Sequence, residues 1–324
     1  MKRIIGIFYF LTIVVFFNVF NNLDADESLR TKKYSTRSPK EAFVWQKKLR
    51  QNLFQLLKLD DLVSLKNQIS FYAKVISSKK QKKYLQQEIE INTTPGRRIK
   101  ILLTLPNKKK DTFPAVVCIH GHGGNRSSVY EKKSIYKGFA SVLAERDYVT
   151  ISTDVGQHEV FEENRILMGE RLWDLMRCVD YLKSLPQVDK SKIGCTGLSL
   201  GGEMAMWLGA MDKRIAATVS AGFLTVMDQM EQNHCMCWKF DGLRELVDFA
   251  DIYSMIAPRP LMCQNGLLEP ETQFYVPLAK KTMKEIKVIY NDFNRSENVV
   301  LQVHASGHEI DLQSLLEFLI KYFR

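Results

Sequence analysis

The sequence has little of what marks several classes of protein. Its six cysteines in 324 residues are too sparse for a disulfide scaffold. It has no internal repeat or low-complexity tract, and apolar residues make up 45% of it, which excludes disordered and collagen-like chains. Only one long apolar run is present, at the N-terminus, which excludes a polytopic membrane protein. The sequence therefore predicts a globular chain with one large domain or two small ones.

Positive charge is concentrated in the N-terminal third. Residues 1–113 carry 23 Lys and Arg against 9 Asp and Glu, whereas residues 114–324 carry 23 against 27. No nucleic-acid-binding module accompanies the basic residues, so neither DNA nor RNA is expected as a partner. The excess is interpreted as a solvated face of the N-terminal region.

The first 25 residues have the composition of an export signal. Met1-Lys2-Arg3 is followed by an apolar run from Ile4 to Phe17, which is short for a helix that crosses a bilayer. The sequence therefore predicts an exported protein with a signal peptide or a signal anchor over residues 1–25. Contact with a membrane is expected only through this segment, if it is not cleaved.

Residues 26–69 are predicted to form a linker and a helical extension. Residues 28–40 are polar and basic, which is typical of a linker. From Ser38 to about Asn67, apolar residues recur at spacings of three and four, which predicts a helical segment packed on the main domain. The apolar residues of this stripe are Phe43, Trp45, Leu49, Leu53, Leu56 and Leu57.

The remaining residues, 70–324, are predicted to form an α/β domain with a mostly parallel sheet. Alternating segments at 84–91 and 99–105 predict an antiparallel hairpin at its edge. Apolar runs then alternate with helical patterns, which predicts helices on both faces. The expected strands are 115–119, 149–153, 193–196, 215–221, 261–263 and 299–303, and the expected helices are 129–146, 169–184, 200–211, 271–288 and 311–322. On the second helix, a row at spacing three is expected to form ion pairs on an exposed face: Arg171, Asp174, Arg177 and Asp180.

Ser199 is the predicted nucleophile. It lies in Gly197-Leu198-Ser199-Leu200-Gly201-Gly202, between an expected strand and an expected helix. A G-x-S-x-G sequence at such a turn places the serine hydroxyl at the C-terminal end of the sheet, where the N-terminus of the helix favours developing negative charge. The alternative is a glycine-rich turn without chemistry.

Two backbone N–H groups are expected to form an oxyanion hole. One belongs to Leu200, the residue after the serine, and the other is expected from His122 in the loop His120-Gly121-His122-Gly123-Gly124. The two histidines of this loop are also compatible with a metal site. No convincing carboxylate or cysteine set accompanies them in the sequence, so no metal is expected there.

The base and the acid are expected on loops that follow later strands. His308 lies between the last expected strand and the last expected helix, and Glu269 is the first carboxylate after the strand at 261–263. The order Ser199, Glu269, His308 predicts a catalytic triad. The alternatives are His304 for the base, and Glu271 or Asp251 for the acid.

Residues 222–252 are longer than a connection between strands needs and are predicted to form a cap over the pocket. His234-Cys235-x-Cys237 within the cap points towards zinc, but no second pair of ligands is evident along the chain, so no metal or other cofactor is expected. The side chains assigned to the substrate pocket are His120, His158, His234 and Trp238.

With these residues assembled, the chain resembles the α/β-hydrolases, and within them the acetyl xylan esterase and dienelactone-hydrolase-like branch. The resemblance covers about residues 40–324 and rests on His120–Gly124, Val188–Gly202, Ile256–Pro260 and Gly307-His308. It implies a serine esterase that acts on small acyl groups, often on plant polysaccharide, without a cofactor. Its triad would be Ser199 as nucleophile, His308 as base and Glu269 as acid.

Three positions bear on the branch within that family. The usual acid is Asp, and Glu269 stands at the matching position. Dienelactone hydrolase uses a cysteine nucleophile, so Ser199 favours the esterase side. Glucuronoyl esterases carry Arg after the serine, so Leu200 argues against that branch. The predicted substrate is a small ester or an acylated polysaccharide such as xylan; the alternatives are a prolyl-oligopeptidase-like peptidase and a catalytically inactive, surface-tethered binding module.

Overall fold

The computed structural model describes residues 30–232 and 234–324. The signal predicted over residues 1–25 lies outside the described residues. Within the part of the chain that is described, no helix combines the length and the apolar character needed to cross a membrane.

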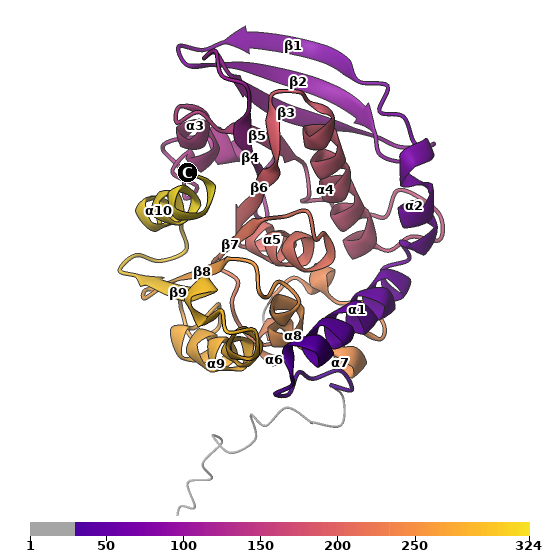
Figure 1. Cartoon of the computed structure of the whole chain (residues 1–324), viewed down its shortest axis with the longest axis vertical. Coiled ribbons are helices and arrows are strands. Elements are labelled where there is room, and N and C mark those ends of the chain that lie inside the picture. The colour runs from indigo at the N-terminus through magenta and orange to yellow at the C-terminus, as the bar shows by residue number, and fades with distance from the viewer. Residues whose placement is uncertain (1–29, 233) are drawn as a thin grey trace, which may run out of the picture.

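A single sheet organises the described residues (Figure 1). The strand order across it is β1-β2-β3-β5-β4-β6-β7-β8-β9. The six neighbouring strands β5, β4, β6, β7, β8 and β9 pair in parallel, and β1, β2 and β3 add an antiparallel edge. The mostly parallel sheet predicted from the sequence is therefore confirmed. The strands are β1 Lys74–Lys80, β2 Tyr84–Asn92, β3 Arg98–Pro106, β4 Phe113–Ile119, β5 Val149–Thr153, β6 Val188–Leu198, β7 Ala217–Ala221, β8 Leu261–Gly266 and β9 Val299–His304.

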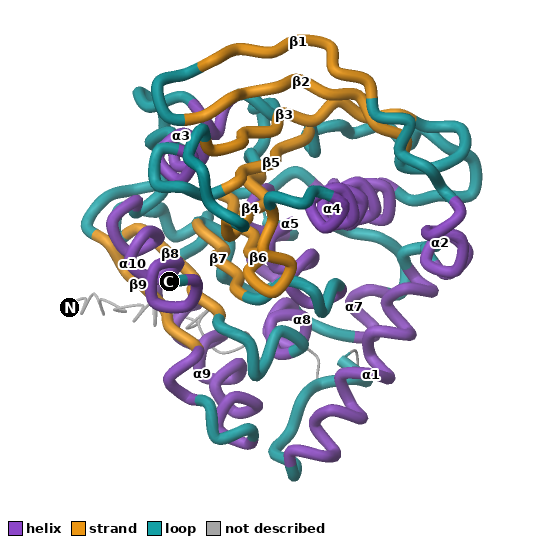
Figure 2. Tube along the Cα trace, turned by 45° about the horizontal axis from the view of Figure 1, so that its top comes forward, coloured by secondary structure: helices purple, strands orange, loops and turns teal. Residues whose placement is uncertain are grey.

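Helices cover both faces of the sheet (Figure 2). α3 and α10 pack on one face with Val116 and Cys118, whereas α4, α5, α8 and α9 pack on the other with Val117 and Ile119. Successive residues of a strand point to opposite faces, which is why β4 is apolar throughout. The helices are α1 Pro39–Leu56, α2 Asp60–Leu65, η1 Lys66–Gln68, η2 Ser128–Tyr130, α3 Phe139–Ala144, α4 Leu167–Ser184, α5 Leu200–Met211, α6 Met227–Met230, η3 Met236–Trp238, α7 Leu243–Leu246, α8 Phe249–Ser254, α9 Val276–Asp292, η4 Ser296–Asn298 and α10 Leu312–Phe323.

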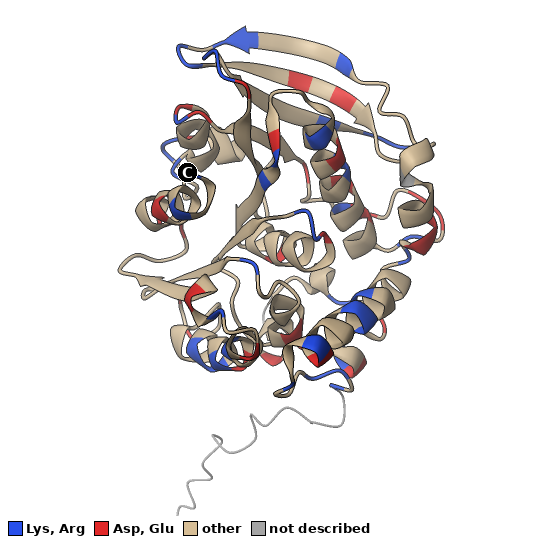
Figure 3. Ribbon diagram, in the orientation of Figure 1, with Lys and Arg blue, Asp and Glu red and all other residues tan. Residues whose placement is uncertain are grey.

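Two elements differ from the sequence prediction. Strand β1 extends the antiparallel edge, and all seven of its residues are exposed, so no buried alternation marks it. The helix expected over 129–146 is reduced to η2 and α3, because Gly138 adopts a left-handed backbone conformation (φ 57°) immediately before α3. Lys and Arg lie along α1 and α9 and towards both ends of β1 (Figure 3). On β1, which is the edge strand, these charged side chains discourage a further strand from pairing with the sheet.

The expected ion-pair row on α4 is buried rather than exposed. Arg171 and Asp174 are fully buried, and Arg177 is 2% exposed. Only Arg177 and Asp180 form an ion pair within the row, at 2.8 Å. Asp174 instead pairs with Arg97, 77 residues away, at 2.5 Å. Loops from distant parts of the chain cover this face of α4, and helical spacing alone does not reveal such cover.

In the described part of the N-terminal extension, residues 30–34 contact the domain, unlike the free linker expected over 28–40. Arg30 pairs with Asp251 at 2.8 Å and with Glu285 at 3.1 Å. The Tyr34 hydroxyl donates to Asp292 at 2.7 Å. Of the stripe predicted on α1, Trp45, Leu49 and Leu53 are buried, whereas Phe43 is 53% exposed and lies against Phe293.

Candidate active site

Ser199 lies at a strained turn between β6 and α5. Its backbone angles are φ 62° and ψ −125°, a region that residues with a side chain rarely adopt and that costs about 1–3 kcal/mol. The Ser199 N–H donates to the carbonyl oxygen of Ala221 at 2.9 Å, which holds the turn against the end of β7. Leu200 and Gly201 begin α5, and the first N–H groups of a helix have no acceptor within it.

Close backbone approach explains two glycines of the motifs. A Cβ at Gly201 would lie well inside contact distance of the carbonyl oxygen of Ile119, at the end of β4. A Cβ at Gly121 would lie 2.8 Å from the carbonyl oxygen of Leu198 and 3.0 Å from Ser199 Cβ. The loop after β4 therefore lies directly against the Ser199 turn.

We expect Gly201→Ala to destabilise the protein by about 2 kcal/mol or more. The reason is that the added methyl group would clash with backbone atoms of Ile119 and His120, which cannot shift as easily as the end of a flexible side chain. Urea denaturation followed by circular dichroism measures the loss. Gly96→Ala is the matched control, since its Cβ would meet no atom closer than 3.9 Å. Equal stabilities of the two variants would contradict the packing argument.

His308 and Glu269 form a hydrogen-bonded pair. His308 Nδ1 lies 2.8 Å from Glu269 Oε1, and the side chains are 30% and 1% exposed. Phe274 stacks on the imidazole at 5.4 Å between ring centroids, with 14° between the planes. The carboxylate and the aromatic ring together fix the orientation of the imidazole.

The alternatives left open by the sequence lie elsewhere. Asp251 accepts from Arg30 and from the Tyr34 N–H, so its carboxylate is already used by the N-terminal extension. The Glu271 side chain is exposed. His304 is the last residue of β9, and its carbonyl oxygen accepts from the Leu267 N–H. Of the named acids, Glu269 is the one bonded to His308.

His120 and Tyr136 brace the glycine-rich loop. The Val155 N–H donates to His120 Nε2 at 3.0 Å, so the other ring nitrogen, Nδ1, carries the proton and donates to the Gly121 carbonyl oxygen at 2.8 Å. The Gly121 N–H donates to the Tyr136 hydroxyl at 2.7 Å. Because His120 is fully buried and both its nitrogens are occupied, its assignment to the substrate pocket was wrong.

A cavity of about 190 Å³ joins the predicted catalytic residues to the cap. Ser199, Leu200, His122 and His308 line it, and so do the cap residues His234 and Trp238. His158 is not among its lining residues and lies instead beside His122, with 5.6 Å between the rings. Residues that the sequence analysis did not assign also line the cavity: Glu203, Phe223, Met230, Cys235, Cys237, Gln273 and Phe274.

Two ionisable side chains that line the cavity, His122 and Glu203, have pKa values shifted towards their neutral forms. Partial desolvation, followed by the positive charge of Arg171, lowers the pKa of His122 to about 4, although part of its side chain is exposed to solvent. Burial also raises the pKa of Glu203 to about 8, against the opposing effect of Arg171. Oε1 of Glu203 has no hydrogen-bond partner.

Glu203 makes stability depend on pH. An acid with a raised pKa holds its proton in the folded state after the unfolded chain has lost it, so stability falls as the pH rises from about 4.5 to about 8. We expect Glu203→Gln to remove a loss of up to about 1.4 kcal/mol per pH unit in this window. The denaturant midpoints of the wild type and of Glu203→Gln, each at pH 5 and pH 8, measure the effect. If the midpoint fell by the same amount between pH 5 and pH 8 in both proteins, Glu203 would not be the cause.

Matches to known proteins agree with this architecture. Residues 91–223 match the family model described as glucuronyl esterase, fungi, and residues 167–284 match a model described as Abhydrolase family. The protein YtaP of Bacillus subtilis is 26% identical over 227 residues, which are 63% of this chain and 75% of YtaP. The segment that matches the glucuronyl esterase model, residues 91–223, includes both Ser199 and the glycine-rich loop.

Solved structures show the same fold. A Bacteroides fragilis protein, provisionally described as an acetyl xylan esterase, superposes with a TM-score of 0.74 at 18% identity and covers 91% of this chain and 92% of its own. The glucuronoyl esterase from Solibacter usitatus superposes with a TM-score of 0.64 at 15% identity and covers 78% and 86%. The chain thus has the α/β-hydrolase fold, and the resemblance noted in the sequence is confirmed at that level.

Proposed function

We propose that the protein is an exported serine esterase that removes short acyl groups, acetyl above all, from carbohydrate such as xylan. One observation carries the proposal: His308, which is hydrogen-bonded to the buried Glu269, lines the same small cavity as Ser199 on its strained turn. The likeness to acetyl xylan and glucuronoyl esterases supports an ester as the substrate. The composition of residues 1–25 supports export.

In the proposed reaction, Ser199 Oγ attacks the ester carbonyl carbon while His308 takes the hydroxyl proton. Because Nδ1 of His308 faces Glu269, Nε2 is the nitrogen that accepts this proton. The N–H groups of Leu200 and His122 hold the negative charge on the carbonyl oxygen. His308 then protonates the leaving alcohol. In the second half of the reaction, a water oxygen attacks the acyl carbon while His308 takes a proton from the water. His308 passes this proton to Ser199 Oγ as the bond between Oγ and the acyl carbon breaks and the acid leaves.

The size of the cavity supports a short acyl group. Its volume of about 190 Å³ lies below the ~300–1,000 Å³ of sites that hold drug-sized ligands. Five apolar residues contribute to its wall: Leu200, Phe223, Met230, Trp238 and Phe274. A methyl group fits beside such a wall, whereas the sugar would remain outside.

The test compares the purified protein on three substrates. We expect release of acetate from acetylated xylo-oligosaccharides, with a kcat/KM at least ~10-fold above that for a methyl glucuronate ester, since one pocket distinguishes related groups by ~10- to 200-fold. A proline-containing peptide tests the peptidase alternative. Cleavage of the glucuronate ester alone would move the substrate to the branch against which Leu200 argues, and cleavage of the peptide alone would overturn the proposal.

A further inference from the structure

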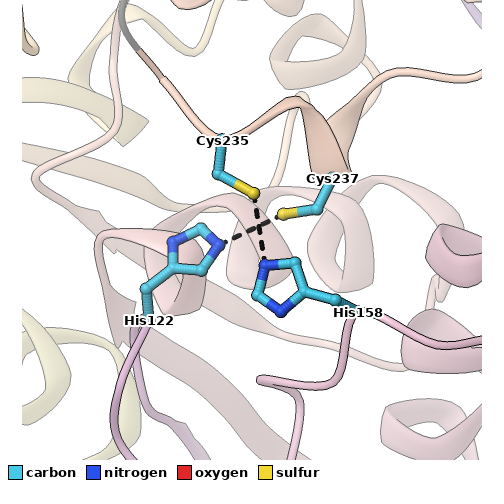
Figure 4. A group of neighbouring side chains, drawn as sticks. All are labelled: His122, His158, Cys235 and Cys237. Atoms are coloured by element: carbon cyan, nitrogen blue, oxygen red, sulfur yellow. Dashed lines mark hydrogen bonds between the residues drawn. The ribbon is translucent and has the colours of Figure 1, made fainter.

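Four potential metal ligands from three segments meet beside the cavity (Figure 4). His122 lies on the loop after β4, His158 on the loop after β5, and Cys235 and Cys237 in the cap. Their ligating atoms all lie within 4.8 Å of one another. His122 Nε2 is 3.1 Å from Cys237 Sγ, and His158 Nε2 is 3.2 Å from Cys235 Sγ.

We propose that His122, His158, Cys235 and Cys237 bind one Zn²⁺ ion in a closed, tetrahedral site. Two imidazoles and two thiolates form a ligand set that proteins use for structural zinc, and tetrahedral S₂N₂ coordination selects zinc among the common divalent ions. The sequence offered Cys235-x-Cys237 without a second pair. The fold supplies that pair from residues 77 and 115 positions away.

The spacing of the ligand atoms fits a single ion. Bonds of about 2.3 Å to sulfur and 2.0–2.1 Å to nitrogen give a tetrahedron with edges of roughly 3.3–3.8 Å. The two nitrogen–sulfur separations of 3.1 and 3.2 Å are slightly shorter than this, so binding requires the side chains to move apart by a few tenths of an ångström. His122, His158 and Cys235 are exposed, which gives the ion a path from solvent.

Arg171 supports the sulfur side of the site. It is fully buried, and its Nη1 donates to Cys237 Sγ at 3.4 Å. Its Nη2 donates to the carbonyl oxygen of Gln157, the residue before His158. Outer hydrogen bonds of this kind orient metal ligands and stabilise thiolate charge. Binding expels the two thiol protons to solvent, so Zn²⁺ with two thiolates and two neutral imidazoles carries no net charge beside the buried guanidinium.

All four positions of the tetrahedron are filled by protein atoms, so the ion would hold structure rather than polarise a substrate. It would join the cap to the loops after β4 and β5. This joint fixes His122, whose N–H belongs to the proposed oxyanion hole, and two cysteines that line the cavity. That catalytic consequence rests on the proposed function, whereas zinc binding itself does not.

The test measures zinc in the purified full-length chain, handled with a reductant and without a chelator. We expect about one zinc ion per chain by inductively coupled plasma mass spectrometry. His158→Ala is expected to weaken zinc binding at least ~10-fold. His158 is exposed and does not line the cavity, so we expect His158→Ala to fold like the wild type. Circular dichroism checks this. His158→Cys should restore binding, because it returns a fourth ligand.

His234→Ala is the matched control. His234 lies next to Cys235, but its Nε2 is 3.1 Å from the carbonyl oxygen of Thr272 and it is not part of the group. This variant should keep its zinc. Cobalt added in place of zinc should give sulfur-to-cobalt charge-transfer absorption in the wild type and lose part of it in Cys237→Ser.

Three results would overturn the proposal. The first is a wild type that carries no zinc and takes up none when zinc is supplied with a reductant. The second is zinc that stays bound in both His158→Ala and Cys237→Ser, which would place the ion elsewhere. The third is a peptide map in which Cys235 and Cys237 of the active protein are joined to each other as a disulfide. None of these readouts depends on ester hydrolysis, so the failure of one proposal is distinguishable from the failure of the other.

Discussion

Ser199→Ala is expected to lower kcat for ester hydrolysis by about 10⁴-fold or more and to abolish labelling by a fluorophosphonate probe. The reason is that the variant keeps the cavity and the His308–Glu269 pair but lacks the oxygen that forms the acyl-enzyme. Gel fluorescence after labelling and initial rates on an acetylated substrate measure the two effects.

A second serine provides the control for this prediction. Ser191 lies on β6, the strand that leads into the Ser199 turn, but near the far end of that strand, where it is exposed and bonded to Asp189. Ser191→Ala should keep full labelling and full activity. Labelling that persists in Ser199→Ala would move the nucleophile to another residue, and absence of labelling in the wild type would favour an inactive binding module.

Glu269→Gln is expected to lower kcat by about 10⁴-fold with little change in KM. The amide would still fill the buried position, but it carries no negative charge to stabilise the imidazolium that forms when His308 takes the serine proton. An amide can also donate its N–H to Nδ1 of His308, which stabilises the wrong tautomer. Steady-state kinetics on an acetylated substrate measures both parameters.

The neighbouring acid makes this prediction sharp. Glu271 lies two residues further along the same loop and is exposed, so Glu271→Gln should leave kcat within about twofold, as surface substitutions generally do. Glu269→Asp should recover part of the activity, because it restores the charge at a somewhat greater distance from the imidazole. If the two Gln variants lost activity equally, Glu269 would not be the acid.

The fold and the meeting of Glu269 with His308 could be predicted because both follow from local rules. Parallel strands end at the same edge of a sheet, so residues that follow β8 and β9 are brought together there whatever lies between them. Gly197 and Gly201, on either side of Ser199, predicted a tight turn, and the structure contains that turn. These signals require only the order of the elements, which apolar runs reveal well.

The residues that escaped prediction depend on contacts across the chain. Tyr136 supports the loop of Gly121 from a segment expected to be plain helix. Phe274 stacks on His308 from a loop that was expected to begin the helix over 271–288, whereas α9 starts only at Val276. The polar row of α4 was expected to face solvent because spacing along a helix reveals which residues share a face but not what covers that face. The partners of Cys235 and Cys237 were missed for the same reason.

The packed start of the described chain has a mechanical consequence. Arg30 and Tyr34 are fastened to α8 and α9 by an ion pair and hydrogen bonds, and the Lys32 N–H donates to the carbonyl oxygen of Leu246, at the end of α7. Any tension or torque that reaches Arg30 therefore passes straight into the helices beside β8, with no slack to absorb it. A tether attached to this end would therefore hold the domain by the side on which α7, α8 and α9 lie.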